Sequence, residues 1–173
     1  MPLWDELRPY TSRLHGVVLD LGCGNGDYSR RLRQMPAVTD VWAVDIAPGS
    51  PEYAHGQNLY QNVRRDRVVQ ANAEDLSFFA DGFFDCAMCW HCIEHTRRPA
   101  KALRELRRVT KDLIMFALPR KGYGAWCSEG HLQAWTEQEF LAQCLRAKLA
   151  WVEGPLIDSP SCMNWLFRVP KRG

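Results

Sequence analysis

The residues best suited to chemistry lie in one short segment, in which an acid precedes three glycines at alternating positions. The apolar stretch 17–21 contains Asp20, and the glycines follow at positions 22, 24 and 26. Such a stretch of β-branched and aliphatic residues is typical of a buried parallel strand, and glycines let a ligand approach the backbone closely. A helix beginning near Asp27 would direct its free N–H groups at a bound anion. The pattern predicts a strand, a ligand-binding turn and a helix.

The spacing of this segment favours a ligand with an ammonium group over a dinucleotide. A dinucleotide fingerprint requires glycine at the position that Asp27 occupies here. Asp20 and Asp27 would repel a pyrophosphate, whereas a carboxylate accepts hydrogen bonds from an ammonium group. A nucleoside that carries an amino acid therefore suits the turn better than a nicotinamide cofactor does.

The run Asp20-Leu21-Gly22-Cys23-Gly24-Asn25-Gly26 resembles motif I of the class I S-adenosylmethionine (SAM) dependent methyltransferases. The resemblance covers residues 14–169, and the core motifs are similar to those of the methyltransferase-11 type, which includes the quinone-biosynthesis C-methyltransferases. It implies SAM as the cofactor and S-adenosylhomocysteine as the product. It also implies direct, in-line transfer of the methyl group to an oxygen, nitrogen or carbon atom of an acceptor.

Two further strands end in residues that suit a nucleoside. The apolar strand 41–46 carries Asp45, 19 residues after Gly26, and a carboxylate there accepts hydrogen bonds from both ribose hydroxyls. In the resembled family, an acid after the third strand accepts the adenine amino group. Asn72 stands at that position in this chain and keeps an acceptor oxygen.

In an open α/β sheet, ligands bind outside the carboxyl ends of the strands, where the strand order reverses. Residues far apart in the sequence therefore converge on one crevice. The residues predicted to bind SAM are Asp20, Gly22, Cys23, Gly24, Gly26, Asp45, Ile46, Asn72, Ala73, Glu74, Cys89 and Trp90.

Three histidines are candidates for removing a proton from an acceptor hydroxyl or amine: His91, His95 and His131. His91 and His95 follow the fourth strand and are the predicted catalytic residues, with His91 nearer the expected methyl position. A structural role for His95, at the start of the next helix, fits the sequence as well. Methyl transfer from a sulfonium requires an in-line approach and a dry, oriented site more than acid–base help.

Metal ligation is a second interpretation of the same segment, because Cys89, His91, Cys92 and His95 are of metal-ligand types at close spacing. The strand end that carries them already contributes to the predicted SAM site, and no second pair of cysteines lies nearby. We therefore expect no metal.

The acceptor is predicted to be a small molecule. The loop 120–135 carries Tyr123, Trp126 and His131, and in the resembled family the loop at this place contributes to the acceptor pocket. No Asp/Asn-Pro-Pro-Tyr/Phe motif follows the fourth strand, which argues against amino methylation of nucleobases or glutamine. No Pro-Cys dipeptide occurs, so a cysteine nucleophile for cytosine methylation is not indicated.

Two other functions stay open. Arginine clusters at 30–33, 64–67 and 104–111 would suit an RNA or protein methyltransferase, although such runs are more typical of a solvated face. The net charge of +2 is too near neutral to indicate nucleic acid. Few residues precede the first strand, so the site would be open, its covering segment would be missing from this sequence, or another segment or subunit, such as a second copy or a partner, would cover it. The chain would then be a homo-oligomer, or a SAM-binding subunit that does not itself methylate.

Length and composition predict a single SAM-binding methyltransferase domain over residues 1–173. No run of 18 apolar residues occurs, and the first 13 residues lack the apolar stretch of a signal peptide. No membrane association is therefore expected. The seven cysteines form an odd set, which favours reduced thiols in a cytoplasmic protein.

The predicted fold class is α/β, a doubly wound seven-stranded Rossmann-like methyltransferase sheet, mostly parallel with an antiparallel C-terminal edge hairpin. The expected strands are 17–21, 41–46, 67–71, 86–90, 112–119, 149–157 and 162–169. The expected helices are 2–12, 28–35, 99–110 and 140–149, the last after a capping box at 136–139.

Overall fold

The structure, a computed structural model, describes residues 2–49, 59–121, 130–156 and 162–171. Tyr123 and Trp126, named above in the loop 120–135, lie outside the described residues. The strands are β1 (Gly16–Leu21), β2 (Val38–Asp45), β3 (Val68–Gln70), β4 (Phe84–Trp90), β5 (Thr110–Pro119), β6 (Ala150–Glu153) and β7 (Cys162–Arg168). The helices are α1 (Pro2–Thr11), α2 (Asp27–Leu32), α3 (Leu59–Asn62), α4 (Pro99–Val109) and α5 (Glu137–Arg146), with short 3-10 helices η1 (Arg65–Arg67) and η2 (Ile93–His95).

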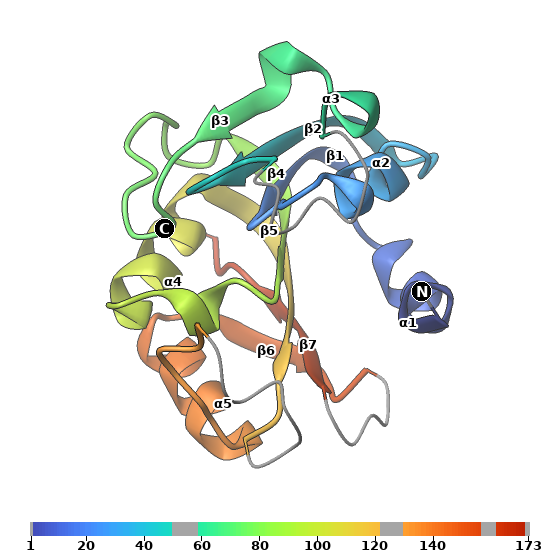
Figure 1. Ribbon diagram of the computed structural model, residues 1–173. Coiled ribbons are helices and arrows are strands. Elements are labelled where there is room, and N and C mark those ends of the chain that lie inside the picture. The colour runs from blue at the N-terminus through green and yellow to red at the C-terminus, as the bar shows by residue number, and fades with distance from the viewer. Residues whose placement is uncertain (1, 50–58, 122–129, 157–161, 172–173) are drawn as a thin grey trace.

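The strands form one seven-stranded sheet in the order β3-β2-β1-β4-β5-β7-β6 (Figure 1). β1 lies parallel to β2 and β4, β2 to β3, and β4 to β5, whereas β7 is antiparallel to both β5 and β6. The predicted fold class is therefore confirmed, including the antiparallel edge at the C-terminal end. The strand order reverses between β1 and β4, so the crevice expected for a ligand lies at the carboxyl ends of these two strands.

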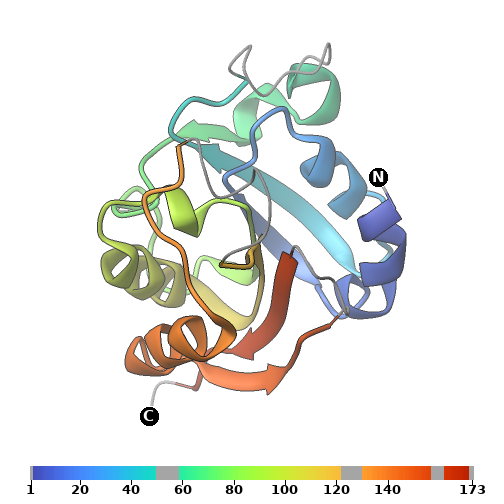
Figure 2. The same ribbon diagram turned by 60° about the horizontal axis from the view of Figure 1, so that its bottom comes forward.

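Helices cover both faces of the sheet, with α4 and α5 on one face and α1 and α2 on the other (Figures 1 and 2). Alternate residues of a strand point to opposite faces. In β4, Ala87 and Cys89 accordingly pack with the cluster that includes α4 and α5, whereas Met88 and Trp90 pack with the cluster of α1 and α2. Burial on both sides explains why β4 is apolar almost throughout.

The ends of several elements differ from the sequence expectation. The strand expected over 149–157 is β6, only four residues long, and the helix expected over 28–35 is α2, which ends at Leu32. The capping box before α5 is confirmed: Thr136 Oγ1 accepts the Glu139 N–H, and the Glu139 carboxylate accepts the Thr136 N–H. Over the ranges that the structure describes, none of the helices is both long and apolar enough to cross a bilayer.

Candidate functional site

The turn after β1 packs directly against the segment after β4. Gly22 has a φ of 80°, and a Cβ built on it would lie 2.5 Å from the Cβ of Cys92. The Gly22 N–H donates to Val44 O over 2.7 Å, which holds the turn beside the end of β2. Only glycine fits here, because a side chain would meet both an unfavourable φ and Cys92.

Gly26 serves a different purpose from Gly22. Its φ is 76°, and an added Cβ would lie 2.7 Å from Leu59 Cδ1 and 2.8 Å from Val63 Cγ2. The missing side chain therefore makes room for α3 and the residue that follows it. Sequence analysis grouped Gly26 with the ligand-binding glycines, and that role stays a prediction.

Asp45, at the end of β2, connects the predicted ribose position with the glycine turn. Its Oδ2 accepts the Gly24 N–H at 3.0 Å, and its Oδ1 accepts the Ala47 N–H at 2.9 Å. A carboxylate has about four lone-pair positions, so further donors can still bind to each oxygen. The adjoining Ile46 side chain is 65% exposed and offers an apolar surface beside this carboxylate.

Asp20 lies beneath the glycine turn and not on its surface. Its side chain is 1% exposed, and it accepts a hydrogen bond from the Ser29 hydroxyl of α2. Burial raises the pKa of Asp20 to about 7, and the charge of Asp45 acts in the same direction. An ammonium contact from Asp20 stays a prediction, while the structure shows that its carboxyl group anchors α2.

The segment after β3 presents one exposed polar group, Asn72, and one ion pair whose carboxylate, that of Glu74, is buried. Asn72 is exposed, and its Oδ1 accepts the Glu74 N–H at 2.9 Å, which leaves one lone pair for another donor. The Glu74 carboxylate accepts the N–H of Arg98 at 2.9 Å and its Nε at 2.7 Å. The hydrogen bonds from Arg98 lower the pKa of Glu74. Glu74 therefore positions the start of α4. Ala73, between Asn72 and Glu74 in the sequence, is buried.

Three other predicted cofactor-binding residues have buried side chains. Cys23 is 6% exposed, Cys89 is 0% exposed and Trp90 is 5% exposed. The Trp90 ring packs against Tyr28 of α2, with ring centroids 4.7 Å apart. A ligand in the crevice would therefore meet the backbone of these residues.

His91 begins the segment after β4 in a backbone conformation that is rare for a residue with a side chain, with a φ of 47°. Its Nδ1 lies 3.2 Å from Glu94 Oε1, and its Nε2 lies 4.0 Å from the Cys162 thiol. Burial lowers the pKa of His91, but the hydrogen bonds with Cys162 and Glu94 outweigh it and raise the pKa to about 9. The ring is then protonated at neutral pH, and an imidazolium donates to Glu94 but accepts no proton.

His95 and His131 come together although they are 36 positions apart, and their ring centroids lie 4.7 Å apart. His95 Nδ1 lies 2.9 Å from Gly130 O. Glu94, a buried acid that the sequence analysis did not select, has a carboxylate oxygen within 4.8 Å of a ring nitrogen of each histidine. Its signal in the sequence is its position, directly before His95 and three residues after His91.

The donor set at the strand ends fits SAM. Asp45 offers lone pairs for the ribose hydroxyls, Ile46 offers an apolar face for a base, and Asn72 offers an acceptor for an amino group. The glycine turn brings backbone, free of Cβ atoms, to the end of β1. These features are those that a nucleoside joined to an amino acid requires.

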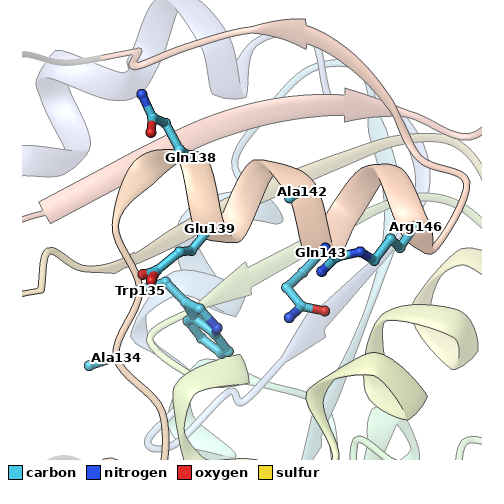
Figure 3. A pocket seen from close by; sticks show the side chains of 7 residues that line it. All are labelled: Ala134, Trp135, Gln138, Glu139, Ala142, Gln143 and Arg146. Carbon is cyan, nitrogen blue, oxygen red and sulfur yellow. The ribbon is translucent and has the colours of Figure 1, made fainter.

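A separate surface pocket of about 470 Å³ runs along one face of α5 (Figure 3). Its lining residues are Ala134, Trp135, Gln138, Glu139, Ala142, Gln143 and Arg146. None of them belongs to the predicted SAM site or to the histidine group. The pocket is therefore separate from the site predicted for SAM.

Relatives of known name point in the same direction. An enzyme named ubiquinone biosynthesis O-methyltransferase from Xanthomonas oryzae pv. oryzae is 35% identical over 94 residues, which are 54% of this chain and 38% of that enzyme. The Xanthomonas campestris pv. campestris enzyme of the same name is 34% identical over 94 residues, with the same coverage. The chain thus spans well under half the length of the curated relatives it matches.

Solved structures share the fold. The methyltransferase in the complex with the Haloferax volcanii Trm112 methyltransferase activator has a TM-score of 0.75 and 18% identity, over 98% of this chain and 90% of that one. A SAM-dependent methyltransferase from Aquifex aeolicus has a TM-score of 0.72 and 18% identity, over 95% of this chain and 89% of that one. A third structure is the 1,6-didemethyltoxoflavin-N1-methyltransferase of Burkholderia thailandensis, solved with S-adenosylhomocysteine. It has a TM-score of 0.68 and 21% identity, over 96% of this chain and 80% of that one.

The family model described as Methyltransferase domain matches residues 18–112, which is more than half of the chain. The matched range runs from β1 into β5 and contains every residue predicted to bind SAM. With the fold and the strand-end geometry in agreement, this chain belongs to the class I, SAM-dependent methyltransferase domain family.

Proposed function

We propose that the chain transfers a methyl group from SAM to a small-molecule acceptor. The observation that carries the proposal is the position of Asp45, whose carboxylate holds the Gly24 N–H at 3.0 Å while lone pairs on both oxygens remain for ribose hydroxyls. The carboxylate is oriented by the backbone before any ligand arrives. This lowers the entropy lost on binding.

Each part of the crevice has a role in this proposal. Asp45 binds the ribose, Ile46 packs against the adenine ring, and Asn72 Oδ1 accepts a hydrogen bond from the adenine amino group. The glycine turn admits the methionine end of the ligand to the backbone. SAM supplies a methyl group on a sulfonium centre. The protein's task is to hold the acceptor in line with that methyl group and to exclude water.

Oxygen is the acceptor atom that the relatives favour. The curated relatives are named O-methyltransferases, whereas the sequence motifs alone resembled the C-methyltransferases of quinone biosynthesis. We propose a hydroxyl group on a small molecule as the acceptor. Its site lies beyond the ends of β4 and β5, where His91, Glu94, His95 and His131 gather.

Two measurements test this function in sequence. Isothermal titration calorimetry with SAM and S-adenosylhomocysteine tests the cofactor, and absence of binding by both at high micromolar concentration would end the proposal. Transfer of a labelled methyl group to a panel of phenols, enols, amines and thiols tests the acceptor class. Label found only in amines would contradict the choice of oxygen.

The structure gives the RNA alternative little support. Arginines in all three basic clusters pair with carboxylates, such as Arg31 with Asp27, Arg67 with Asp40 and Arg108 with Glu105. Paired charges contribute less to a phosphate-binding surface than free ones do. RNA affinity that falls steeply as salt is raised would favour that alternative over a small-molecule acceptor.

We also propose that residues 1–173 form one methyltransferase domain, because β6 and β7 complete the sheet beyond the matched range. The structural relative from Haloferax volcanii was solved in a complex with an activator protein. We propose that a partner or a second copy covers the crevice of this chain. A monomer in light scattering that methylates at full rate alone would contradict that part.

A further inference from the structure

We propose that Glu94, His95 and His131 bind a divalent transition-metal ion next to the crevice. Each offers one ligand atom, and these atoms all lie within 4.8 Å of one another. Within the ranges that the structure describes, this is the group of metal-ligand types that comes together. Binding of the metal does not depend on the function proposed above.

Glu94 is the strongest part of the site. Its side chain is 1% exposed, and its Oε1 lies 3.2 Å from His91 Nδ1. Its Oε2 is buried and has no hydrogen-bond partner among the residues described. A buried carboxylate oxygen without a partner is costly, and a metal ion would satisfy it.

The His95 ring is oriented as a metal ligand requires. Its Nδ1 lies 2.9 Å from Gly130 O, and because a carbonyl only accepts hydrogen bonds, Nδ1 must carry the proton. Nε2 is then the ring nitrogen that can bind a metal. Metal-binding histidines are usually oriented in this way, by a hydrogen bond from the other ring nitrogen to a carbonyl or carboxylate.

His131 is held beside Glu94 by the backbone of its own loop. The N–H groups of Leu132 and Gln133 both donate to Glu94 O, at 2.9 and 3.0 Å. These hydrogen bonds fix the loop after β5 against η2 and set the His131 ring 4.7 Å from that of His95. The third ligand is therefore positioned by main-chain hydrogen bonds from the two residues that follow it to the Glu94 carbonyl oxygen.

Two imidazoles and one carboxylate form a donor set suited to Zn²⁺, Fe²⁺ or Mn²⁺, with positions left open for water or substrate. Metal bonds of about 2.0–2.2 Å place neighbouring ligand atoms about 3–3.5 Å apart, so the side chains would close by about 1 Å on binding. The sequence analysis expected no metal, on a candidate set that lacked Glu94 and His131.

The position of this site suggests its use, and this step rests on the proposed function. Glu94 and His95 belong to η2, which follows the carboxyl end of β4 at the crevice. An acceptor hydroxyl bound to the metal would lose its proton to solvent more readily, because the cation stabilises the oxygen anion. The expected acceptor is therefore one whose hydroxyl can reach a cation, such as a phenol or an enol.

Cobalt(II) is the probe of choice, because its visible absorption reports the ligands that bind it. Titration of the full chain should show one Co²⁺ per chain, without the near-ultraviolet charge-transfer band of a thiolate. Glu94→Gln and His131→Ala should each weaken binding about tenfold or more. His15→Ala is the matched control, because His15 pairs with Asp112 away from the site, and its affinity should be unchanged.

The experiment separates this inference from the proposed function. S-adenosylhomocysteine calorimetry on the same samples, together with thermal melting, shows whether each variant is folded and binds the nucleoside. Absence of Co²⁺ binding by a wild-type chain that binds S-adenosylhomocysteine would overturn the metal site alone. A thiolate band, or equal affinity in His131→Ala and wild type, would overturn it too.

Discussion

Asp45 Oδ2 accepts the Gly24 N–H over 3.0 Å, and this one hydrogen bond joins the end of β2 to the glycine turn after β1. The Ala47 N–H, on the other carboxylate oxygen, completes the orientation of the side chain. The two features that the sequence analysis selected 21 positions apart, a turn and an acid, therefore form one structural unit. A nucleoside that binds there meets a carboxylate whose rotamer is already fixed.

Replacement of Gly22 by alanine should damage both stability and the site. The new Cβ would lie 2.5 Å from Cys92 Cβ, and the backbone φ of 80° disfavours any side chain. Gly22→Ala is expected to lower the free energy of unfolding by about 1–3 kcal/mol and to weaken S-adenosylhomocysteine binding. Urea denaturation and calorimetry measure the two effects.

Gly82→Ala separates backbone strain from the clash at Gly22. Gly82 also has a positive φ, 61°, but its added Cβ would meet only the flexible Lys111 side chain, at 3.2 Å. The double variant Gly22→Ala/Cys92→Gly should recover part of the lost stability, since it removes the contacted Cβ. Equal losses in Gly22→Ala and Gly82→Ala, with no recovery, would contradict the role given to Cys92.

The buried carboxyl group of Asp20 should make stability depend on pH. Its pKa is raised from 3.8 to about 7 in the folded chain, so between these values the folded state holds more protons than the unfolded state. Stability must then fall as pH rises from about 4 to 7 and level off above that. Asp20→Asn removes the titration and keeps an acceptor for Ser29. Its free energy of unfolding should rise relative to that of wild type across this window, by on the order of 4 kcal/mol in total.

Urea unfolding of Asp20→Asn and wild type at several pH values measures that gain. The difference in free energy of unfolding between the two chains should be smallest near pH 4 and largest above pH 7. Curves that stay parallel over the whole range would show that Asp20 titrates with an ordinary pKa. Burial beneath the glycine turn would then not raise the pKa of Asp20.

The capping box of α5 should contribute measurably to stability. Thr136 Oγ1 accepts the Glu139 N–H at 3.2 Å, and replacement of such a residue by alanine costs about 1 kcal/mol. Thr136→Ser keeps the hydroxyl and should retain most of the stability. Thermal melting compares the two variants. Equal melting temperatures for Thr136→Ala and Thr136→Ser would mean that the cap contributes nothing.

Local signals in the sequence predicted the frame of the molecule well. The apolar runs gave the strands, and the Thr136–Glu139 spacing gave the start of α5, because such short-range patterns carry their own physical cause. The convergence of strand ends followed from topology. Strand and helix ends were less accurate, as β6 shows, because tertiary pairing and not propensity decides where a short edge strand stops.

Contacts between distant side chains were beyond sequence reasoning. The pairing of Glu74 with Arg98, the burial of Asp20 against Ser29, and the meeting of His95 with His131 each join separate elements. Nothing in the local pattern distinguishes a carboxylate that faces a ligand from one that anchors a helix. The fold decides which role each acid takes, and so only a structure reveals it.

The central claim, that the carboxylate at the end of β2 holds the nucleoside, is tested most directly by calorimetry with S-adenosylhomocysteine on wild type, Asp45→Ala and Asp40→Ala. Asp40 lies on the same strand and pairs with Arg67, so its variant controls for loss of an acid from β2. Asp45→Ala should weaken binding by about 1–3 kcal/mol, and Asp40→Ala should bind as wild type does. Wild-type affinity in Asp45→Ala would contradict the account.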